Sequence, residues 1–135
     1  MKFLFVEDNR VTRLSVSRIL KKDFPTIEIV EAENGQKAFD YLKQCAREDL
    51  PYFILLDLNM PIMDGIEFLA LLRQDERFTT LPVVIFTTSS NLDDYYKCEN
   101  SSISGYFIKN VDFKKFQETL IIIGQYWLNS FNDKT

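Results

Sequence analysis

The chain has 135 residues, a formal net charge of −4 and no histidine, and 46% of its residues are hydrophobic. With no signal peptide pattern and no apolar run near the ~20 residues of a membrane span, this length predicts a single cytoplasmic domain and no second, output-bearing domain. The acidic balance argues against direct binding to nucleic acid, and the absence of His excludes His-ligated metals and His-based catalytic triads.

The first half of the chain predicts three strands separated by two helices. Apolar strand runs cover Lys2–Val6, Ile27–Glu31 and Phe53–Asp57, and the third has the unbroken apolar character of a strand buried on both faces. Helical periodicity runs from Arg10 to about Phe24 and from Gly35 to about Arg47.

The second half continues the alternation. It predicts a helix after the loop 60–65, a strand at Val83–Phe86, a short helix to about Glu99, a strand at Gly105–Ile108 and a helix to about Asn129. Ser90 is expected to cap the short helix and Asp112 the last one. Five strands alternating with five helices favour an α/β fold, a doubly wound parallel sheet between two layers of helices.

Polar side chains follow the ends of four predicted strands. Glu7 and Asp8 follow the first, Asp57 ends the third, Thr87 follows the fourth and Lys109 follows the fifth. Right-handed crossovers bring these ends to one edge of the sheet, so we expect the side chains to meet there. Three carboxylates in one pocket repel one another unless a cation is bound, and oxygen ligands suit Mg²⁺. A hydroxyl and an ammonium group beside the ion suit a phosphoryl group, with Asp57 as the nucleophile.

Five motifs occur in this chain in a characteristic order. They are the acidic pair, Asp57 in Leu-Asp-Leu-Asn-Met-Pro, Asp64-Gly65, Thr87 at a strand end, and Lys109 in Gly-Tyr-Phe-Ile-Lys. Together they resemble the receiver domain of bacterial two-component response regulators, and the stand-alone, chemotaxis-like receivers in particular. The resemblance covers about the whole chain. It implies one receiver domain over residues 1–135 and a flavodoxin-like, five-stranded parallel sheet with strand order 2-1-3-4-5.

The resemblance also implies a chemistry. Asp57 would accept a phosphoryl group from a phosphohistidine on a sensor histidine kinase or phosphotransfer protein. Asp8, Asp57 and the backbone carbonyl of Asn59 would hold Mg²⁺, with Glu7 acting through a water, and Lys109 would pair with the phosphoryl oxygens. The protein would be a phosphoacceptor in signalling that catalyses its own phosphorylation and dephosphorylation, rather than a conventional enzyme.

A switch follows from the same resemblance. Thr87 would swing to hydrogen-bond the phosphoryl group, and Tyr106 would turn inward into the space that Thr87 leaves. The surface of the fourth helix, fifth strand and fifth helix would then change for a downstream protein target. Asn59, Thr88 and Ser89 match positions that tune hydrolysis of the acyl phosphate.

One residue departs from the family pattern. The family usually has Pro after the lysine, with a cis peptide bond, whereas this chain has Asn110. A cis bond before a non-proline residue costs ~2.5–4 kcal/mol, against ~0.5–1 kcal/mol before Pro. We therefore predict a trans bond, or a strained cis one, between Lys109 and Asn110.

Three other functions compete with a phosphorylated receiver. Asn110 favours a pseudo-receiver, a binding module whose output is independent of phosphorylation. A flavin or nucleotide binder would need a Gly-rich phosphate loop after the first strand, and the chain has only four Gly. A Mg²⁺-dependent phosphatase would need a general acid close after the nucleophile, where Asn59 cannot serve.

The last helix carries more apolar residues than one buried face needs. A predicted core stripe consists of Phe113, Phe116, Leu120, Ile123 and Trp127. A second group lies largely off that stripe and consists of Ile121, Ile122, Tyr126, Leu128 and Phe131. Monomers rarely expose large apolar patches, so the second group predicts a homodimer or partner interface, with simple extra burial as the alternative.

Overall fold

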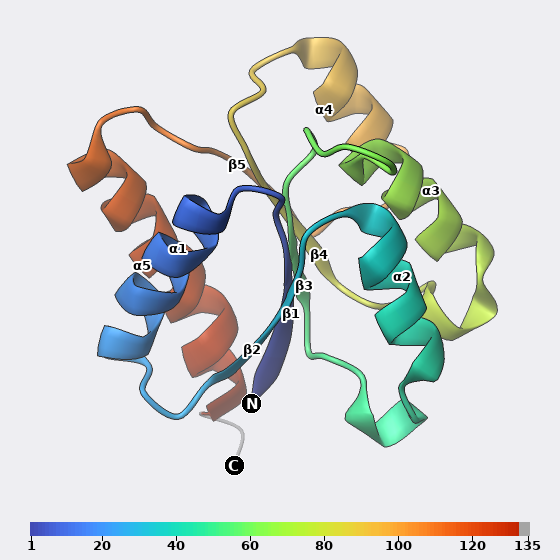
Figure 1. Cartoon of the computed structure of the whole chain (residues 1–135), viewed down its shortest axis with the longest axis horizontal. Helices are drawn as coiled ribbons and strands as arrows, with labels where there is room; N and C mark the ends of the chain where they lie inside the picture. The colour runs from blue at the N-terminus through green and yellow to red at the C-terminus, as the bar shows by residue number, and fades with distance from the viewer. Residues whose placement is uncertain (133–135) are drawn as a thin grey trace.

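The computed structural model describes the backbone of residues 1–132 and the side chains of residues 1–128. The strands are β1 Lys2–Val6, β2 Glu28–Ala32, β3 Ile54–Leu56, β4 Val83–Thr87 and β5 Gly105–Ile108. They form one parallel sheet in the order β2-β1-β3-β4-β5 (Figure 1). The predicted doubly wound fold and its strand order are confirmed.

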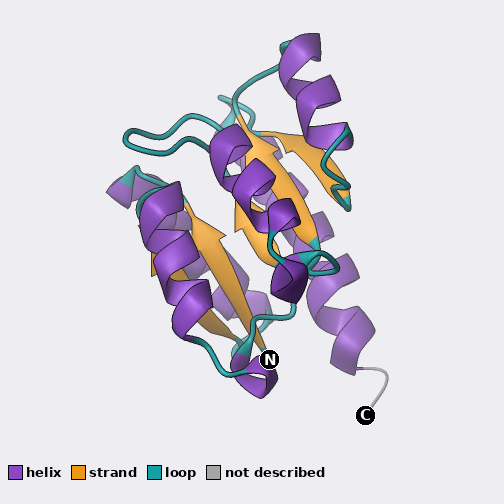
Figure 2. Cartoon of the chain, turned by 90° about the vertical axis from the view of Figure 1, so that its right-hand side faces the viewer, coloured by secondary structure: helices purple, strands orange, loops and turns teal. Residues whose placement is uncertain are grey.

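Helices cover both faces of this sheet (Figures 1 and 2). They are α1 Arg10–Asp23, α2 Gly35–Gln44, α3 Gly65–Gln74, α4 Leu92–Glu99 and α5 Phe113–Asn132, with 3₁₀ turns η1 Arg47–Asp49 and η2 Glu76–Phe78. α1 and α5 lie on one face, and α2, α3 and α4 lie on the other. No helix in the described part of the chain is long and apolar enough to span a membrane.

The central strands are buried on both faces, as their unbroken apolar runs predict. In β1, Phe3 and Phe5 pack into the core under α1 and α5, whereas Leu4 and Val6 pack into the core on the opposite face. This is the period-two alternation of a strand between two helical layers. Burial of each side chain of this size stabilises the folded state by roughly 1.5–3 kcal/mol, so the sheet holds the residues at its edge in stable positions.

Strand register brings the polar strand ends level with one another. Val6 pairs with Leu56, and the residues that follow them are Glu7 and Asp57. The Asp57 N–H donates to the Val6 carbonyl at 3.0 Å, which continues the ladder one residue beyond β3. Thr87 ends β4 beside the end of β5. The topology and the register therefore place these residues at one edge, the carboxyl edge of the sheet.

Two local predictions were wrong in detail. α2 ends at Gln44 rather than near Arg47, because the chain turns there into the separate η1. α4 is capped by Asn91 and not by Ser90, since the Asn91 side chain accepts the Asp93 N–H at 2.8 Å. Ser and Asn are comparable caps, so the sequence alone could not decide between neighbours.

The amino end of α5 was only partly predicted. Asp112 does cap the helix, because its carboxylate accepts the Lys114 N–H at 2.9 Å. The prediction of a core stripe is confirmed for Phe116, Leu120, Ile123 and Trp127, which pack in or against the core. It is wrong for Phe113, which is 61% exposed. Phe113 is the first residue of α5, whereas the members of the stripe that contact the core lie in later turns.

The interface group on α5 is divided. Leu128 is 1% exposed and belongs to the core, so its assignment to an interface was wrong. The cause is Gly124, where an added Cβ would lie 2.5 Å from the Phe24 ring, so that α1 approaches closely and covers this side of α5. Ile122 and Tyr126 are exposed. Ile121 is half-buried, and the Phe131 side chain lies outside the described residues.

Candidate functional site

An acidic pocket lies at the carboxyl edge of the sheet. One carboxylate oxygen from each of Glu7, Asp8 and Asp57 lies within 4.8 Å of the others. Glu7 is 1% exposed and Asp57 4%, whereas Asp8 is exposed to solvent. The Lys109 ammonium contacts Glu7 Oε1 and lies 3.6 Å from Asp57 Oδ2. The structure thus brings together four of the residues predicted to meet at this edge.

Among the described residues, the Lys109 ammonium is the one cation in contact with the three carboxylates of this pocket. Burial raises the pKa of Glu7, the Lys109 ammonium opposes that rise, and the Asp57 carboxylate adds to it. Asp57 Oδ1 is buried without a hydrogen-bond partner among the described residues, a costly situation for a charged acceptor. Three carboxylates and an unsatisfied buried oxygen form a donor set that suits a hard divalent cation such as Mg²⁺.

The loop that carries Glu7 and Asp8 is held by Arg13. Its Nη1 donates to the carbonyl of Glu7 at 2.7 Å and to that of Asp8 at 3.1 Å, while its Nε pairs with Glu31 at 3.1 Å. The Asn9 side chain caps α1 beside it. Our reading of the sequence missed Arg13. The available signal was an arginine one helical turn into the helix that follows the acids.

The loop after Asp57 depends on a glycine. A Cβ at Gly65 would lie 2.4 Å from the backbone oxygen of Asp57, a separation that real Cβ atoms do not show. The Gly65 N–H donates to the Leu58 carbonyl at 2.9 Å, and Asp64 forms a capping box with Glu67. α3 therefore starts directly against the backbone of the central acid.

A cavity of about 390 Å³ opens beside this loop. It is lined by Asp8, Leu58, Asn59, Met60, Pro61, Asp64, Ile66 and Asp94. Asp8 and Asn59, both predicted site residues, therefore line the same cavity. Asp94, which comes from α4, is a member of this cavity that our reading of the sequence did not anticipate.

The β4–α4 loop links the site to β5. Thr87 is fully buried, and its Oγ1 accepts the Ser89 N–H at 3.3 Å. The half-buried Tyr106 donates its hydroxyl to the Ser89 carbonyl at 3.0 Å, and burial raises the pKa of that phenol. Thr88 is exposed. The Tyr106 hydroxyl is therefore in direct contact with the loop that follows Thr87.

The peptide bond between Lys109 and Asn110 was predicted to be trans, or cis with strain. Residues 1–132 contain no cis peptide bond, so the bond between Lys109 and Asn110 is trans, as predicted. The Lys109 N–H still donates to the Thr87 carbonyl at 2.6 Å. The Asn110 side chain accepts the Asp112 N–H at 2.9 Å and so forms the turn that leads into α5.

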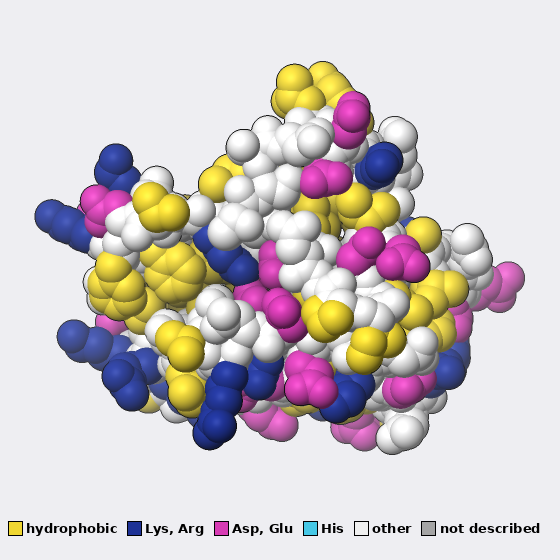
Figure 3. Space-filling view, turned by 45° about the horizontal axis from the view of Figure 1, so that its top comes forward, with side chains coloured by type: hydrophobic (Ala, Val, Ile, Leu, Met, Phe, Trp, Pro, Cys, Tyr) yellow, Lys and Arg dark blue, Asp and Glu magenta, His cyan; other side chains and the backbone are white. Residues whose placement is uncertain are grey.

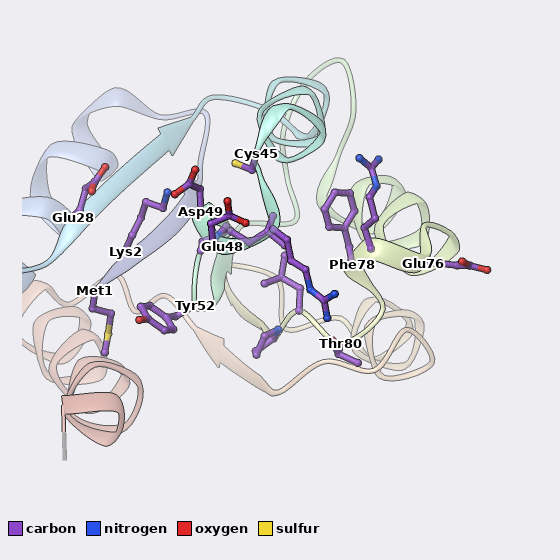
Figure 4. Close-up of a pocket in the computed structure, with 16 residues that line it drawn as sticks. Met1, Lys2, Glu28, Cys45, Glu48, Asp49, Tyr52, Glu76, Phe78 and Thr80 are labelled. Atoms are coloured by element: carbon purple, nitrogen blue, oxygen red, sulfur yellow. The ribbon is translucent and has the colours of Figure 1, made fainter. Parts of the chain in front are cut away.

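A larger cavity of about 920 Å³ lies at the opposite, amino edge of the sheet (Figure 4). Acidic and basic side chains are spread around it, and Glu28 and Glu76 lie at its two ends. Its polar groups do not converge on one point, and Arg77 is already paired with Asp75 at 2.8 Å. Chemistry therefore favours the smaller, acidic pocket as the functional site.

Comparison with known proteins gives a consistent set of similarities. The family model described as response regulator receiver domain matches residues 3–121. The probable methanogenesis regulatory protein FilR2 of Methanothrix harundinacea is 34% identical over 127 residues, which are 93% of this chain and 82% of that protein. The response regulator Rcp1 of Synechocystis is 32% identical over 130 residues, which are 94% of this chain and 88% of that protein.

Solved structures agree with the sequence relatives. The phosphorylated cyanobacterial phytochrome response regulator RcpA is 30% identical, with a TM-score of 0.88 and coverage of 96% of this chain and 94% of that one. The Mn²⁺-bound form of the response regulator Rcp1 is 31% identical, with a TM-score of 0.80 and coverage of 94% of both chains.

Proposed function

This chain belongs to the response regulator receiver domain family, and we propose that it accepts a phosphoryl group on Asp57 and signals through the change that follows. The observation that carries the proposal is the position of Asp57. It is buried between two other acids and the Lys109 ammonium, and its Oδ1 has no hydrogen-bond partner among the described residues. Phosphoryl transfer requires a nucleophilic oxygen that is not already hydrogen-bonded and a cation that neutralises the charge developing on the phosphoryl group. Asp57 Oδ1 and the Lys109 ammonium match these requirements.

Mg²⁺ is the proposed cofactor. Asp8, Asp57 and the backbone carbonyl of Asn59 would hold it, with Glu7 acting through a water. The carboxylate cluster of this chain and the Mn²⁺-bound form of the similar Rcp1 support this assignment. When bound, the ion would neutralise the charge that develops on the transferring phosphoryl oxygens.

The donor would be a phosphohistidine on a histidine kinase or phosphotransfer protein. One oxygen of the Asp57 carboxylate attacks phosphorus, the phosphorus–nitrogen bond breaks, and the imidazole nitrogen keeps the electron pair. Lys109 moves from Glu7 towards a phosphoryl oxygen, and Thr87 turns its hydroxyl to donate to another. These contacts exist only in the phosphorylated state, so they shift the population of conformers.

The mouth of the pocket offers a surface for that donor. Exposed apolar side chains lie on the elements that follow β1 and β5 at this edge. They are Val11 and Leu14 on α1, Val111 in the loop after β5, and Phe113 at the start of α5. Figure 3 looks obliquely onto this end of the molecule and shows hydrophobic side chains on both sides of a charged centre. A partner that delivers a phosphohistidine to Asp57 must cover this rim, and burial of the rim would stabilise the encounter.

The output surface would comprise α4, β5 and α5. Tyr106 would respond to movement of Thr87, while Asn59, Thr88 and Ser89 would set the access of water to the acyl phosphate. On α5, the exposed Ile122 offers an apolar contact for a homodimer or a downstream protein. Light scattering at high concentration, with and without a phosphoryl mimic, would test the homodimer, and a monomer in both states would exclude it.

A pseudo-receiver is the second candidate. The observation that favours it is the contact between Lys109 and Glu7, because a lysine already satisfied by a buried acid is less available to a phosphoryl group. In that case Asp57 would stay unmodified, and the partner would recognise the unphosphorylated surface.

Incubation with Mg²⁺ and acetyl phosphate separates the two candidates. We expect a Mg²⁺-dependent band shift on a phosphate-affinity gel for the wild type and none for Asp57→Asn. Asp40→Asn on α2, where the side chain is 50% exposed, is the matched control and should shift like the wild type. A wild type that does not shift at any Mg²⁺ concentration would favour the pseudo-receiver.

A further inference from the structure

Ser89 is hydrogen-bonded to residues of three elements, β4, β5 and α4. Its N–H donates to Thr87 Oγ1 at 3.3 Å, and its carbonyl accepts the Tyr106 hydroxyl at 3.0 Å. Its own hydroxyl donates to Asp94 Oδ2, in the first turn of α4, at 2.7 Å. A change at Thr87 therefore reaches β5 through the Ser89 backbone and α4 through the Ser89 side chain.

The amino end of α4 is held by this side-chain contact. Asp94 is half-buried and lines the 390 Å³ cavity that it shares with Asp8 and Asn59. The Ser89 hydroxyl also accepts the Asn91 N–H at 3.3 Å, so one oxygen ties the loop to the helix start. In the described part of the chain, no other side chain of the β4–α4 loop is hydrogen-bonded to the side chain of a residue within α4.

The carboxyl end of α4 is held differently. The Arg73 guanidinium, which comes from α3, donates to the carbonyls of Ser101, Ser102 and Phe78 at 2.8, 3.0 and 2.7 Å. Cys98, in the last turn of α4, is fully buried in the core. The turn after α4 is therefore anchored to α3 by the two charge-assisted hydrogen bonds to Ser101 and Ser102, and the last turn of α4 is held by apolar packing.

We propose that Asp94 is a positioning residue that couples α4 to the phosphorylation of Asp57. In the unphosphorylated chain its bond to Ser89 holds the amino end of α4 against the β4–α4 loop. Phosphorylation releases that end, and α4 turns about the carboxyl end that Arg73 keeps in place. This inference rests on the proposed function of Asp57.

Two effects of a phosphoryl group act on the contact in the same direction. If Thr87 turns towards the phosphoryl oxygens, the Ser89 N–H loses its acceptor, and the loop loses one of its anchors. The phosphoryl group also brings a charge of about −1.5 to −2 to the pocket beside a cavity that the Asp94 carboxylate lines. Both effects destabilise the hydrogen bond between Ser89 and Asp94. This contact therefore has a formed and a broken state, and phosphorylation favours the broken state.

Hydrogen exchange at peptide resolution tests the proposal. In the wild type, Mg²⁺ with beryllium fluoride, a mimic of the phosphoryl group, should speed amide exchange over residues 90–96 by about 3- to 10-fold, the range that one ordinary hydrogen bond gives. Residues 98–104 should not change. In Asp94→Ala the unphosphorylated protein should already exchange at the faster rate over residues 90–96, so that the mimic adds little.

Matched variants separate coupling from a general structural effect. Asp94→Asn keeps an acceptor for the Ser89 hydroxyl and should retain slow exchange without the mimic. Ser89→Ala should behave like Asp94→Ala, and the double variant should add nothing further. Arg73→Lys should speed exchange over residues 100–104 equally in both states and leave the response over residues 90–96 in place.

The outcomes distinguish this inference from the function on which it rests. Each variant is also assayed for phosphorylation by acetyl phosphate on a phosphate-affinity gel. A wild type that is not phosphorylated overturns the proposed function and the coupling together. A wild type that is phosphorylated, but whose α4 exchange is unchanged or responds equally in Asp94→Ala, overturns the coupling alone.

Discussion

The two edges of the sheet differ in size and in chemistry. The amino edge has a cavity of about 920 Å³ with acids and bases spread around it, whereas the cavity beside Asp57 measures about 390 Å³. At the carboxyl edge, three carboxylates and one ammonium converge on a few ångströms. The carboxyl edge is therefore distinguished by the convergence of its polar groups and not by the volume of its cavity.

The difference follows from how parallel strands end. β1, β3 and β4 are buried over almost their whole length and carry Glu7, Asp57 and Thr87 at their carboxyl ends. The register keeps Glu7 and Asp57 level and places Thr87 one residue further along. At the amino edge, residues of the short 3₁₀ turns line much of the cavity, and their side chains are mostly exposed. A polar side chain that directly follows a buried strand therefore has a more fixed position than one on an exposed 3₁₀ turn.

The largest contrast between the edges is expected from lysine substitutions. Lys109→Gln removes the only ammonium in contact with Glu7 and Asp57 among the described residues. We expect phosphorylation by acetyl phosphate to slow by about 100-fold, the scale of losing one charge-stabilising donor. Lys2→Gln, in the amino-edge cavity, should phosphorylate within about twofold of the wild type. A comparable loss in both variants would remove the contrast.

A second contrast concerns glycine packing. Gly65→Ala puts a Cβ against the Asp57 backbone oxygen, so we expect a loss of about 1–3 kcal/mol in the free energy of unfolding. Gly105→Ala, on β5, meets the movable Phe107 ring at 3.1 Å and should cost less. Urea unfolding measures both, and a smaller loss for Gly65→Ala would show that the start of α3 can shift away from Asp57.

The pH dependence of stability provides a third test. The pKa of Glu7 is raised by burial, against the effect of Lys109, so this group stabilises the folded chain below its unfolded pKa. That contribution is lost as pH rises through the folded pKa. In metal-free buffer, Glu7→Gln should therefore gain stability relative to the wild type as pH increases from about 4 to 7. A constant difference across that range would show that Glu7 titrates normally.

The rate at which a thiol reagent labels Cys98 tests whether the carboxyl end of α4 moves, and its expected change is the smallest of the four. Burial raises the pKa of Cys98 to about 11, and the nearby Asp94 carboxylate adds to the rise. In Cys45→Ser, we expect Cys98 to resist a thiol reagent at pH 8 both with and without beryllium fluoride, because the carboxyl end of α4 stays anchored. Faster labelling with the mimic would mean that the whole helix leaves α3.

The fold and the acids of the site could be predicted because they depend on local patterns. The sheet and its carboxyl edge are predicted by the apolar runs, by the polar residues at their ends and by the alternation of strands and helices. None of these patterns depends on contacts between residues that are distant in the sequence. Arg73 and Asp94 could not be found in this way, since their importance lies in hydrogen bonds to other segments of the chain. Arg13 has a local signal, its place one helical turn after the acids, but its hydrogen bonds to their backbone are visible only in the structure. The burial of Leu128 likewise depends on how closely α1 approaches α5 at Gly124.

The central claim is that Asp57 is the residue that becomes phosphorylated. Acyl phosphates react with borohydride, which reduces a phosphorylated aspartate to homoserine. After incubation with Mg²⁺ and acetyl phosphate, borohydride reduction and peptide mass spectrometry should locate homoserine at position 57 of this chain and at no other aspartate. Homoserine at another position, or none in a protein whose Mg²⁺ and donor are saturating, would contradict the account.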